Sequence, residues 1–242
     1  MNSLLHGKFE PITASIGLIK APLSITTEDF LRWGNEALFK YGQSKEKTPL
    51  RCGLNAAFNN LLPLVQGSIN RQLLLAIGSQ WTAYFDNGWR GSDPDGVAAV
   101  MSRRLHTTTI RLTRTCNTLQ STYGRARGTY GATIFEVWEA SQTSRRSIAC
   151  ANDGGRWVFE QRGEPYAFED LPRYQNRRLA DRFPPELLEK YVEQFGVNPF
   201  SEASYLNERN EVSGFLIEKK GNLPKTLKNI ELSEARHALG LE

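Results

Sequence analysis

The sequence lacks any long hydrophobic run. Its longest uninterrupted apolar segments, residues 73–77 and 97–101, are far shorter than the roughly 20 residues that a membrane-spanning helix needs. The first ten residues contain no apolar core of about 7–15 residues, which a secretory signal peptide would require. We therefore expect a cytoplasmic protein with no membrane partner.

Cysteine is also scarce. The chain has three cysteines, Cys52, Cys116 and Cys150, and none of them is part of a CxxC spacing. An odd number of widely spaced thiols is typical of reduced side chains rather than of a disulfide framework or a structural zinc site. No histidine lies close to Cys52 or Cys150 in the sequence, so we expect all three thiols to be unpaired and none to act as a nucleophile.

The signatures of common catalytic and cofactor-binding sites are missing as well. The sequence contains no GxSxG elbow, no HExxH motif, no P-loop and no dinucleotide-binding fingerprint. Its three histidines, His6, His106 and His237, are far apart in unrelated contexts. The sequence therefore predicts no cofactor and does not point to an enzyme.

What the chain does have is an ordinary globular composition. Of its 242 residues, 40% are hydrophobic, 10% aromatic and 23% charged, and the formal net charge is +4. A chain of this length buries roughly 70–75% of its unfolded surface and needs no disulfide or metal to fold. We expect residues 1–200 to form one domain, with a sub-boundary near residue 120 as an alternative, and residues 201–242 to form a helical extension packed on it.

Apolar periodicity predicts the order of the elements. We expect strands at residues 12–20, 48–52, 80–86, 107–115, 133–139, 146–151, 156–160 and 214–219. We expect helices over residues 26–42, 54–62, 93–105, 171–183, 185–196 and 225–239. The first half then has the βαββαβ order of a ferredoxin-like unit with an added helical insertion. The expected fold class is α+β, with a mainly antiparallel sheet, helices largely on one side and a helical C-terminal third.

The segment 81–96 concentrates aromatic and charged residues. Trp89 lies beside Arg90, and neither strand alternation nor helical spacing requires its ring to be buried. Exposed Trp and Arg side chains are typical anchors of protein interfaces. We therefore expect an exposed loop over residues 87–95 that binds a partner through Trp89, Arg90, Asp93 and Asp95. Trp89→Ala should weaken that binding by roughly thirtyfold with little loss of stability.

The carboxylates of the same segment allow two other interpretations. Asp86, Asp93 and Asp95 could meet around Ca²⁺ or Mg²⁺ in a metal-dependent hydrolase, although the run does not match an EF-hand loop. Alternatively, Asp86 begins a turn, and Asp93 or Asp95 caps the following helix. We favour the structural interpretation and predict no metal site.

A basic stretch follows at residues 102–128, which contain no Asp or Glu. Its six arginines are Arg103, Arg104, Arg111, Arg114, Arg125 and Arg127. Guanidinium groups suit phosphates, and Tyr123 and Tyr130 could stack on bases, so RNA binding or RNA processing is the alternative function. Its contacts would be Arg103, Arg104, Arg125 and Arg127. Strand alternation sends Arg111 and Arg114 to opposite faces, which favours a solvated basic edge instead.

Three segments carry a resemblance to known proteins. GSQWTAYFDNGWRGSDPDG (78–96), SIACANDGGRWVFEQRGEPYAFEDLPRY (147–174) and RRLADRFPPELLEKYVEQFGV (177–197) are similar to a group of bacterial cytosolic proteins, over about residues 10–200. The second half, with a hairpin at 152–155 and helices after it, resembles immunity proteins, which neutralise bacterial toxins. The resemblance implies a binding role and assigns no site residue. We therefore predict a bacterial cytosolic protein-interaction module, of the immunity type that binds and occludes a toxin.

Overall fold

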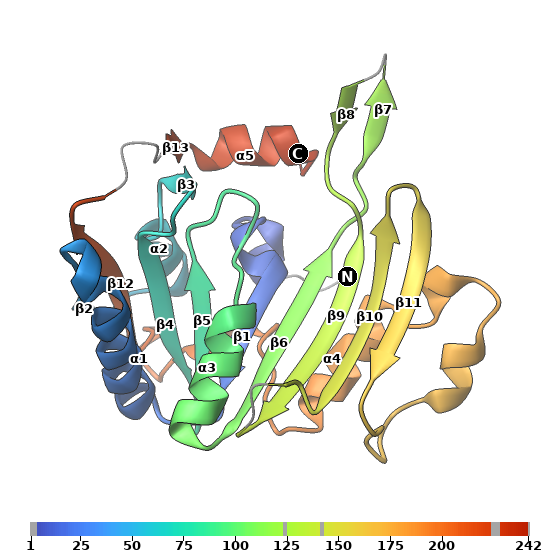
Figure 1. The fold of residues 1–242 in the computed structure, drawn as a ribbon, viewed down its shortest axis with the longest axis horizontal. Helices are drawn as coiled ribbons and strands as arrows, with labels where there is room; N and C mark the ends of the chain where they lie inside the picture. The colour runs from blue at the N-terminus through green and yellow to red at the C-terminus, as the bar shows by residue number, and fades with distance from the viewer. Residues whose placement is uncertain (1–3, 123–124, 141–142, 224–227, 242) are drawn as a thin grey trace.

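The fold is built around one large antiparallel sheet. A computed structural model describes residues 4–122, 125–140, 143–223 and 228–241. Nine strands lie side by side in the order β11-β10-β9-β6-β1-β5-β4-β12-β2, and each is antiparallel to its neighbours (Figure 1). Their bounds are β1 (Ser15–Ile19), β2 (Gln43–Leu50), β4 (Arg71–Ile77), β5 (Trp81–Asp86), β6 (Thr108–Thr115), β9 (Ala132–Glu139), β10 (Arg146–Asp153), β11 (Arg156–Arg162) and β12 (Gly214–Gly221).

Shorter elements complete the chain. Two small ribbons pair β3 (Leu64–Gln66) with β13 (Lys228–Ile230), and β7 (Gln120–Thr122) with β8 (Arg125–Arg127). The α-helices are α1 (Leu23–Leu38), α2 (Leu54–Asn59), α3 (Asp95–Leu105), α4 (Pro185–Glu193) and α5 (Leu232–Leu239). The 3₁₀ turns are η1 (Leu4–Gly7), η2 (Ile12–Ala14), η3 (Phe39–Tyr41), η4 (Leu171–Gln175), η5 (Leu179–Asp181) and η6 (Glu202–Tyr205). No helix among the described residues is long and apolar enough to cross a membrane.

Strand alternation divides the apolar residues between two cores. On β5, Trp81, Ala83 and Phe85 point into the larger core, while Tyr84 points into the smaller one. Helices α2, α4 and α5 supply apolar side chains to the larger core, and α1 and α3 supply them to the smaller core. Figure 1 shows α1 and α3 lying together in front of the sheet and α4 behind it. The expectation that helices lie largely on one side is therefore wrong, because both faces of the sheet are apolar and both are covered.

The sheet and several of its strands confirm the sequence interpretation. An α+β fold with a large antiparallel sheet is what the structure has, and the strands at residues 80–86, 107–115 and 133–139 are present with shifted ends. The hairpin at 152–155 joins β10 to β11. Gly154 and Gly155 adopt φ of 67° and 107°, and Asn152 accepts a hydrogen bond from the Gly155 amide at 2.8 Å. Glycine supplies these positive φ angles without steric cost.

The expected topology differs from the observed one in three places. The strand expected at 48–52 is β2, and it lies at the outer edge of the sheet instead of beside the strand at 80–86. Strand β5 lies between β1 and β4, and β4 was expected from the sequence only as an apolar run. Strand β12 lies between β4 and β2 within the main sheet. The helical C-terminal third is thus not confirmed, because a strand from this part of the chain completes the sheet.

A buried ion pair fastens the segment after β11 to the sheet. The side chains of Arg146 on β10 and Glu169 are 1% and 0% exposed, and Arg146 Nε donates to Glu169 Oε1 at 2.8 Å. Tyr174 donates its hydroxyl to Glu169 Oε2 at 2.9 Å and lies 2.9 Å from the Tyr191 hydroxyl. This network joins β10, η4 and α4, so it holds three elements that hydrophobic contact alone would leave free to slide.

We predict that Glu169→Gln lowers the free energy of unfolding by about 3–5 kcal/mol, because it leaves the Arg146 guanidinium buried without its counter-charge. Urea unfolding followed by circular dichroism measures the change. The control is Glu160→Gln, which removes the same charge from an exposed position on β11 and should change stability by about 0.5 kcal/mol or less. Equal effects of the two substitutions would show that the ion pair does not hold the segment.

Candidate functional site

The loop after β5 is fixed by the buried carboxylate of Asp86. Asp86 is 1% exposed, and it accepts hydrogen bonds from the Tyr84 hydroxyl at 3.1 Å and from the amides of Gly88 and Asp93 at 3.0 Å each. Burial raises the pKa of Asp86, and the hydrogen bonds from the two amides oppose this shift. Asp86 therefore closes the loop as the turn interpretation expected.

Trp89 is less exposed than the sequence predicts, and no observation tests its role as an anchor. Its ring is partly buried and packs against the larger core, and the Arg90 guanidinium lies 4.9 Å from the ring centroid. Asn87, Gly88 and Ser92 are also buried, so the loop 87–95 is only partly open to solvent. Trp89→Ala should consequently lower stability as well as any binding, since it removes an apolar ring from a core contact.

Asp93 and Asp95 are exposed, but they do not form a metal site with Asp86. Asp95 lies at the first turn of α3 and forms an ion pair with Arg111 at 3.5 Å. Both carboxylate oxygens of Asp86 already accept hydrogen bonds, from the Gly88 and Asp93 amides and from the Tyr84 hydroxyl. Across the described residues, no group of three His, Cys, Asp or Glu side chains could hold a metal ion. The hydrolase interpretation therefore lacks the ligand geometry that it requires.

The arginines of the basic stretch are spread over different faces, and several of them pair with carboxylates. Arg104 forms a two-pronged hydrogen bond with Asp29 of α1 at 2.7 and 3.1 Å, and its Nη1 contacts Glu36. Arg111 contacts Glu136, whereas Arg114 on the other face contacts Glu189 of α4.

Arg103 and Arg127 lie away from these three paired arginines. Arg103 is exposed on α3, and Arg127 donates to the carbonyl of His237 in α5 at 2.8 Å. The side chain of Arg125 and the residue Tyr123 lie outside the described part of the structure. The described arginines thus do not converge on one surface.

A different exposed surface, which sequence analysis did not single out, lies where α1 turns into β2. Phe39 is 85% exposed, Tyr41 is 58% exposed, and Leu223 beyond the end of β12 is 36% exposed. The Gln43 side chain donates to the carbonyl of Asn222, which holds Leu223 at the same end of the β2–β12 pair as Tyr41. We call Phe39, Tyr41 and Leu223 the edge patch. The helix expected over residues 26–42 would include Phe39 and Tyr41, but α1 ends at Leu38 and the chain continues as η3.

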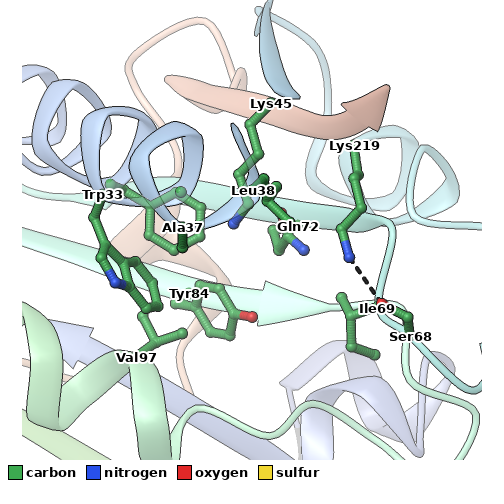
Figure 2. A pocket seen from close by; sticks show the side chains of 12 residues that line it. Trp33, Ala37, Leu38, Lys45, Ser68, Ile69, Gln72, Tyr84, Val97 and Lys219 are labelled. Carbon is green, nitrogen blue, oxygen red and sulfur yellow. Dashed lines mark hydrogen bonds between the residues drawn. The ribbon is translucent and has the colours of Figure 1, made fainter. Parts of the chain in front are cut away.

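A pocket of about 270 Å³ lies beside α1, and its lining includes Ala37 and Leu38, the residues that precede Phe39 of the edge patch. We call it the lysine pocket, because Lys45 and Lys219 line it. Figure 2 shows it between α1, α3 and the sheet. Its walls are mostly apolar, from Phe30, Trp33, Gly34, Ala37, Leu38, Ile69, Tyr84 and Val97, and its polar lining residues are Lys45, Ser68, Gln72 and Lys219. Lys45 lies 3.9 Å from the Phe30 ring centroid and 5.7 Å from that of Trp33. Lys219 donates to the Ser68 hydroxyl at 2.8 Å.

The two lysines of this pocket are direct cross-strand partners, because Lys45 of β2 pairs with Lys219 of β12. Like charges directly opposite one another destabilise a sheet. The next cross-strand pair, Glu46 and Glu218, is also of one sign, but Glu218 is compensated by Arg71 at 3.5 Å and Lys220 at 2.9 Å. Among the described residues, neither Lys45 nor Lys219 forms an ion pair within 4.0 Å.

Electrostatics in the pocket favour a neutral Lys45. Burial, and then the charge of Lys219, lower the pKa of Lys45 to about 7, although Asp86 acts in the opposite direction. Burial also lowers the pKa of Lys219. Gln72 is 4% exposed, and its Oε1 has no hydrogen-bond partner among the described residues. Among the described residues, the pocket thus holds two lysine amino groups without a carboxylate partner and one buried acceptor without a donor.

The three cysteines are free thiols, as expected from the sequence. Cys52 is partly buried, Cys116 is exposed and Cys150 is buried. Burial raises the pKa of all three, which favours the protonated thiol over the reactive thiolate. None of them lines the lysine pocket.

We predict that stability rises with pH because of Lys45. Its pKa is about 7 when folded against an ordinary value of 10.5, so the unfolded chain binds more protons between these values, and unfolding becomes less favourable as pH increases from about 7 to about 10. Lys45→Met should remove this part of the slope, and Lys40→Met, at an exposed position, should keep it. Urea unfolding at several pH values measures the difference. A slope unchanged by Lys45→Met would show that Lys45 titrates normally.

Comparison of the chain with protein-family models, with curated proteins and with solved structures finds no significant match. What this protein binds is therefore inferred from its own residues.

Proposed function

We propose that this chain is a protein-binding module that docks its partner through the edge patch. The observation that supports this proposal is the exposure of Phe39, at 85%, together with Tyr41 and Leu223 at the same end of the sheet. Aromatic side chains bury a large area at low entropic cost, and they are enriched among the residues that dominate binding energy. Exposed apolar groups of this size are typical of surfaces that a partner covers.

The surroundings of the edge patch favour an acidic partner. Lys40 and Lys220 are exposed at this end of the sheet, and the Lys40 ammonium lies 4.9 Å from the ring centroid of Tyr41. Such cations steer an acidic surface toward the patch and fix its orientation. They add less to the affinity than the aromatic rings do, since exposed ion pairs contribute little.

The partner does not need to add a strand to the sheet. Strand β2 is an edge strand, but the Asn35 side chain accepts a hydrogen bond from the Lys45 amide at 2.6 Å and contacts its carbonyl at 3.5 Å. Pro49 has no amide hydrogen to offer. An edge blocked in this way resists pairing with another strand, so we propose recognition through side chains.

In its specific form, the proposal is the one that the resemblance implied, a bacterial cytosolic immunity protein that occludes a toxin. The loop residues Trp89, Arg90, Asp93 and Asp95 remain a second candidate surface, in which Arg90 and the two exposed carboxylates would make the contacts. We do not extend the proposal to RNA, because the paired and scattered arginines offer no single phosphate-binding face.

We also propose that a ferredoxin-like unit lies inside the sheet, formed by other strands than the sequence indicated. Strands β6, β1, β5 and β4 are neighbours in that order and antiparallel, and α1 and α3 cover one face. In this proposal β2, α2 and β3 are an insertion between α1 and β4. The order would be that of the split βαβ arrangement.

The test is a double substitution, Phe39→Ala with Tyr41→Ala. We expect it to abolish enrichment of one specific protein in quantitative affinity purification from the native host, because each lost aromatic anchor costs about 2 kcal/mol of binding. Thermal stability should stay within about 0.5 kcal/mol of the wild type, since both side chains are exposed.

Two matched controls make the result specific. Ile25→Ala removes another exposed apolar side chain, 51% exposed on α1, and should leave the enriched protein bound. Arg90→Ala with Asp93→Ala tests the loop instead. If only the loop variant loses the partner, the edge patch is not the docking surface, and if all variants enrich the same proteins as the wild type, neither surface is.

A further inference from the structure

The lysine pocket places two lysines directly opposite each other, which destabilises the sheet. Lys45 and Lys219 face each other across β2 and β12, and Lys45 is held against the rings of Phe30 and Trp33. A desolvated ammonium is stabilised in part by aromatic faces, but no carboxylate of the described residues lies within ion-pairing distance to offset it. The buried carboxylate of Asp86 raises the pKa of Lys45 but forms no ion pair with it, and it already accepts three hydrogen bonds.

Gln72 provides a second and independent indication. Gln72 is only 4% exposed and lines the pocket. Its Oε1 has no hydrogen-bond donor among the described residues. A buried acceptor left without a donor costs about as much as a lost hydrogen bond, so native proteins rarely leave one empty. Figure 2 shows the polar ends of Lys45, Gln72, Tyr84 and Lys219 around a common space, bordered on one side by Trp33 and Val97.

From these features we infer that the pocket binds a small organic anion, an acidic group carried on a flat apolar body. The two ammonium groups would receive the anionic oxygens, and the rings of Phe30, Trp33 and Tyr84 would enclose the body. A hydrogen-bond donor on the body would satisfy Gln72. Neighbouring aliphatic side chains, Ala37, Leu38 and Val97, favour an apolar ligand over a sugar or a free inorganic ion.

The size of the pocket limits the ligand. A volume of about 270 Å³ is slightly below the usual range for ligand sites, which begins at about 300 Å³. Nucleotides and lipids are therefore too large, whereas one aromatic ring system with a short acidic arm fits. Indole-3-acetate combines the three required features, since it has a carboxylate, a planar ring and an N–H donor.

Isothermal titration with indole-3-acetate tests this inference, and phenyl phosphate serves as the second anion to distinguish a carboxylate from a phosphate head. For ligands of this size we expect a Kd on the order of 1 mM or lower for at least one of them. Indole-3-acetamide, which has the same shape without the charge, should bind about tenfold more weakly or worse. Equal binding of the amide, or no saturable binding of either anion, would overturn the proposal.

Variants locate the binding. Lys45→Met and Lys219→Met should each weaken indole-3-acetate binding by about tenfold or more, and Lys40→Met, at an exposed lysine outside the pocket, should not change it. Gln72→Met should remove the preference for indole-3-acetate over its 1-methyl derivative, which has no N–H. If Lys40→Met weakens binding as much as Lys45→Met, the anion is held by surface charge and not by the pocket.

Proton uptake on binding is measured with the wild-type protein, so this test does not depend on whether a variant folds. The anion requires a charged Lys45. Lys219 and Tyr84 are its titratable neighbours in the pocket lining, and Asp86, outside the lining, also acts on its charge. Binding near neutral pH should therefore take up a proton, seen as a dependence of the binding enthalpy on the ionisation enthalpy of the buffer. Affinity should fall as pH rises from about 7 to about 9. No proton uptake would contradict the assignment of Lys45 as the anion-binding group.

This inference goes beyond the proposed protein-binding function and can fail separately from it. The double variant of Phe39 and Tyr41 leaves the pocket lining intact and should bind indole-3-acetate normally. Lys45→Met leaves the edge patch intact and should keep the protein partner.

Discussion

The structure depends on one constraint, which is that strand β5 must bury both of its faces. All six of its residues are buried, and alternation gives Trp81, Ala83 and Phe85 to one core and Thr82, Tyr84 and Asp86 to the other side. A strand of this kind requires cover on both sides, so the chain places α1 and α3 over one face and α2, α4 and α5 over the other. Asp86 ends the strand on the side of α1 and α3, and its buried carboxylate then decides how the next loop closes.

The position of β12 has the largest consequence for the surface. Because this late strand inserts between β4 and β2, it separates the β2 edge from the rest of the early sheet and places Lys219 opposite Lys45. The same pairing brings the end of β12 to the turn that follows α1, where Phe39 and Tyr41 are exposed. The pairing of β2 with β12 thus positions both surfaces. The lysine pocket presents desolvated lysine side chains, whereas the edge patch presents exposed aromatic side chains.

How far the sequence predicts this structure depends on the range of the interactions involved. The strand at 80–86 and the hairpin at 152–155 follow from alternation and turn chemistry within a few residues, and both are present. Strand β4 was not predicted, because its run of Leu73, Leu74 and Leu75 has no alternation from which a half-buried strand could be identified. Trp89 was misplaced for a related reason, since its contact with the core is made by tertiary packing.

The candidate site was beyond the reach of local patterns. Lys45 stands in an ordinary polar stretch and Lys219 follows a glutamate, so each is typical of a solvated strand position when considered alone. Their meeting depends on the pairing of β12 with β2, which no spacing in the sequence indicates. The arginines of residues 103–127 show the converse, because the fold pairs Arg104, Arg111 and Arg114 of this dense basic run with separate carboxylates.

Two kinds of cation are withdrawn from water in this fold, and they differ in whether a carboxylate compensates them. Arg146 is buried with Glu169, and Arg104 is paired with Asp29, so these cations are compensated and contribute to holding elements together. Lys45 is also largely withdrawn from water, yet it faces another lysine and two aromatic rings. An apolar side chain at this position would pack against Phe30 and Trp33 without the desolvation cost. A position that keeps a costly charge where a hydrophobic residue would be more stable is typical of a binding site, because the missing counter-charge can then be supplied by a ligand.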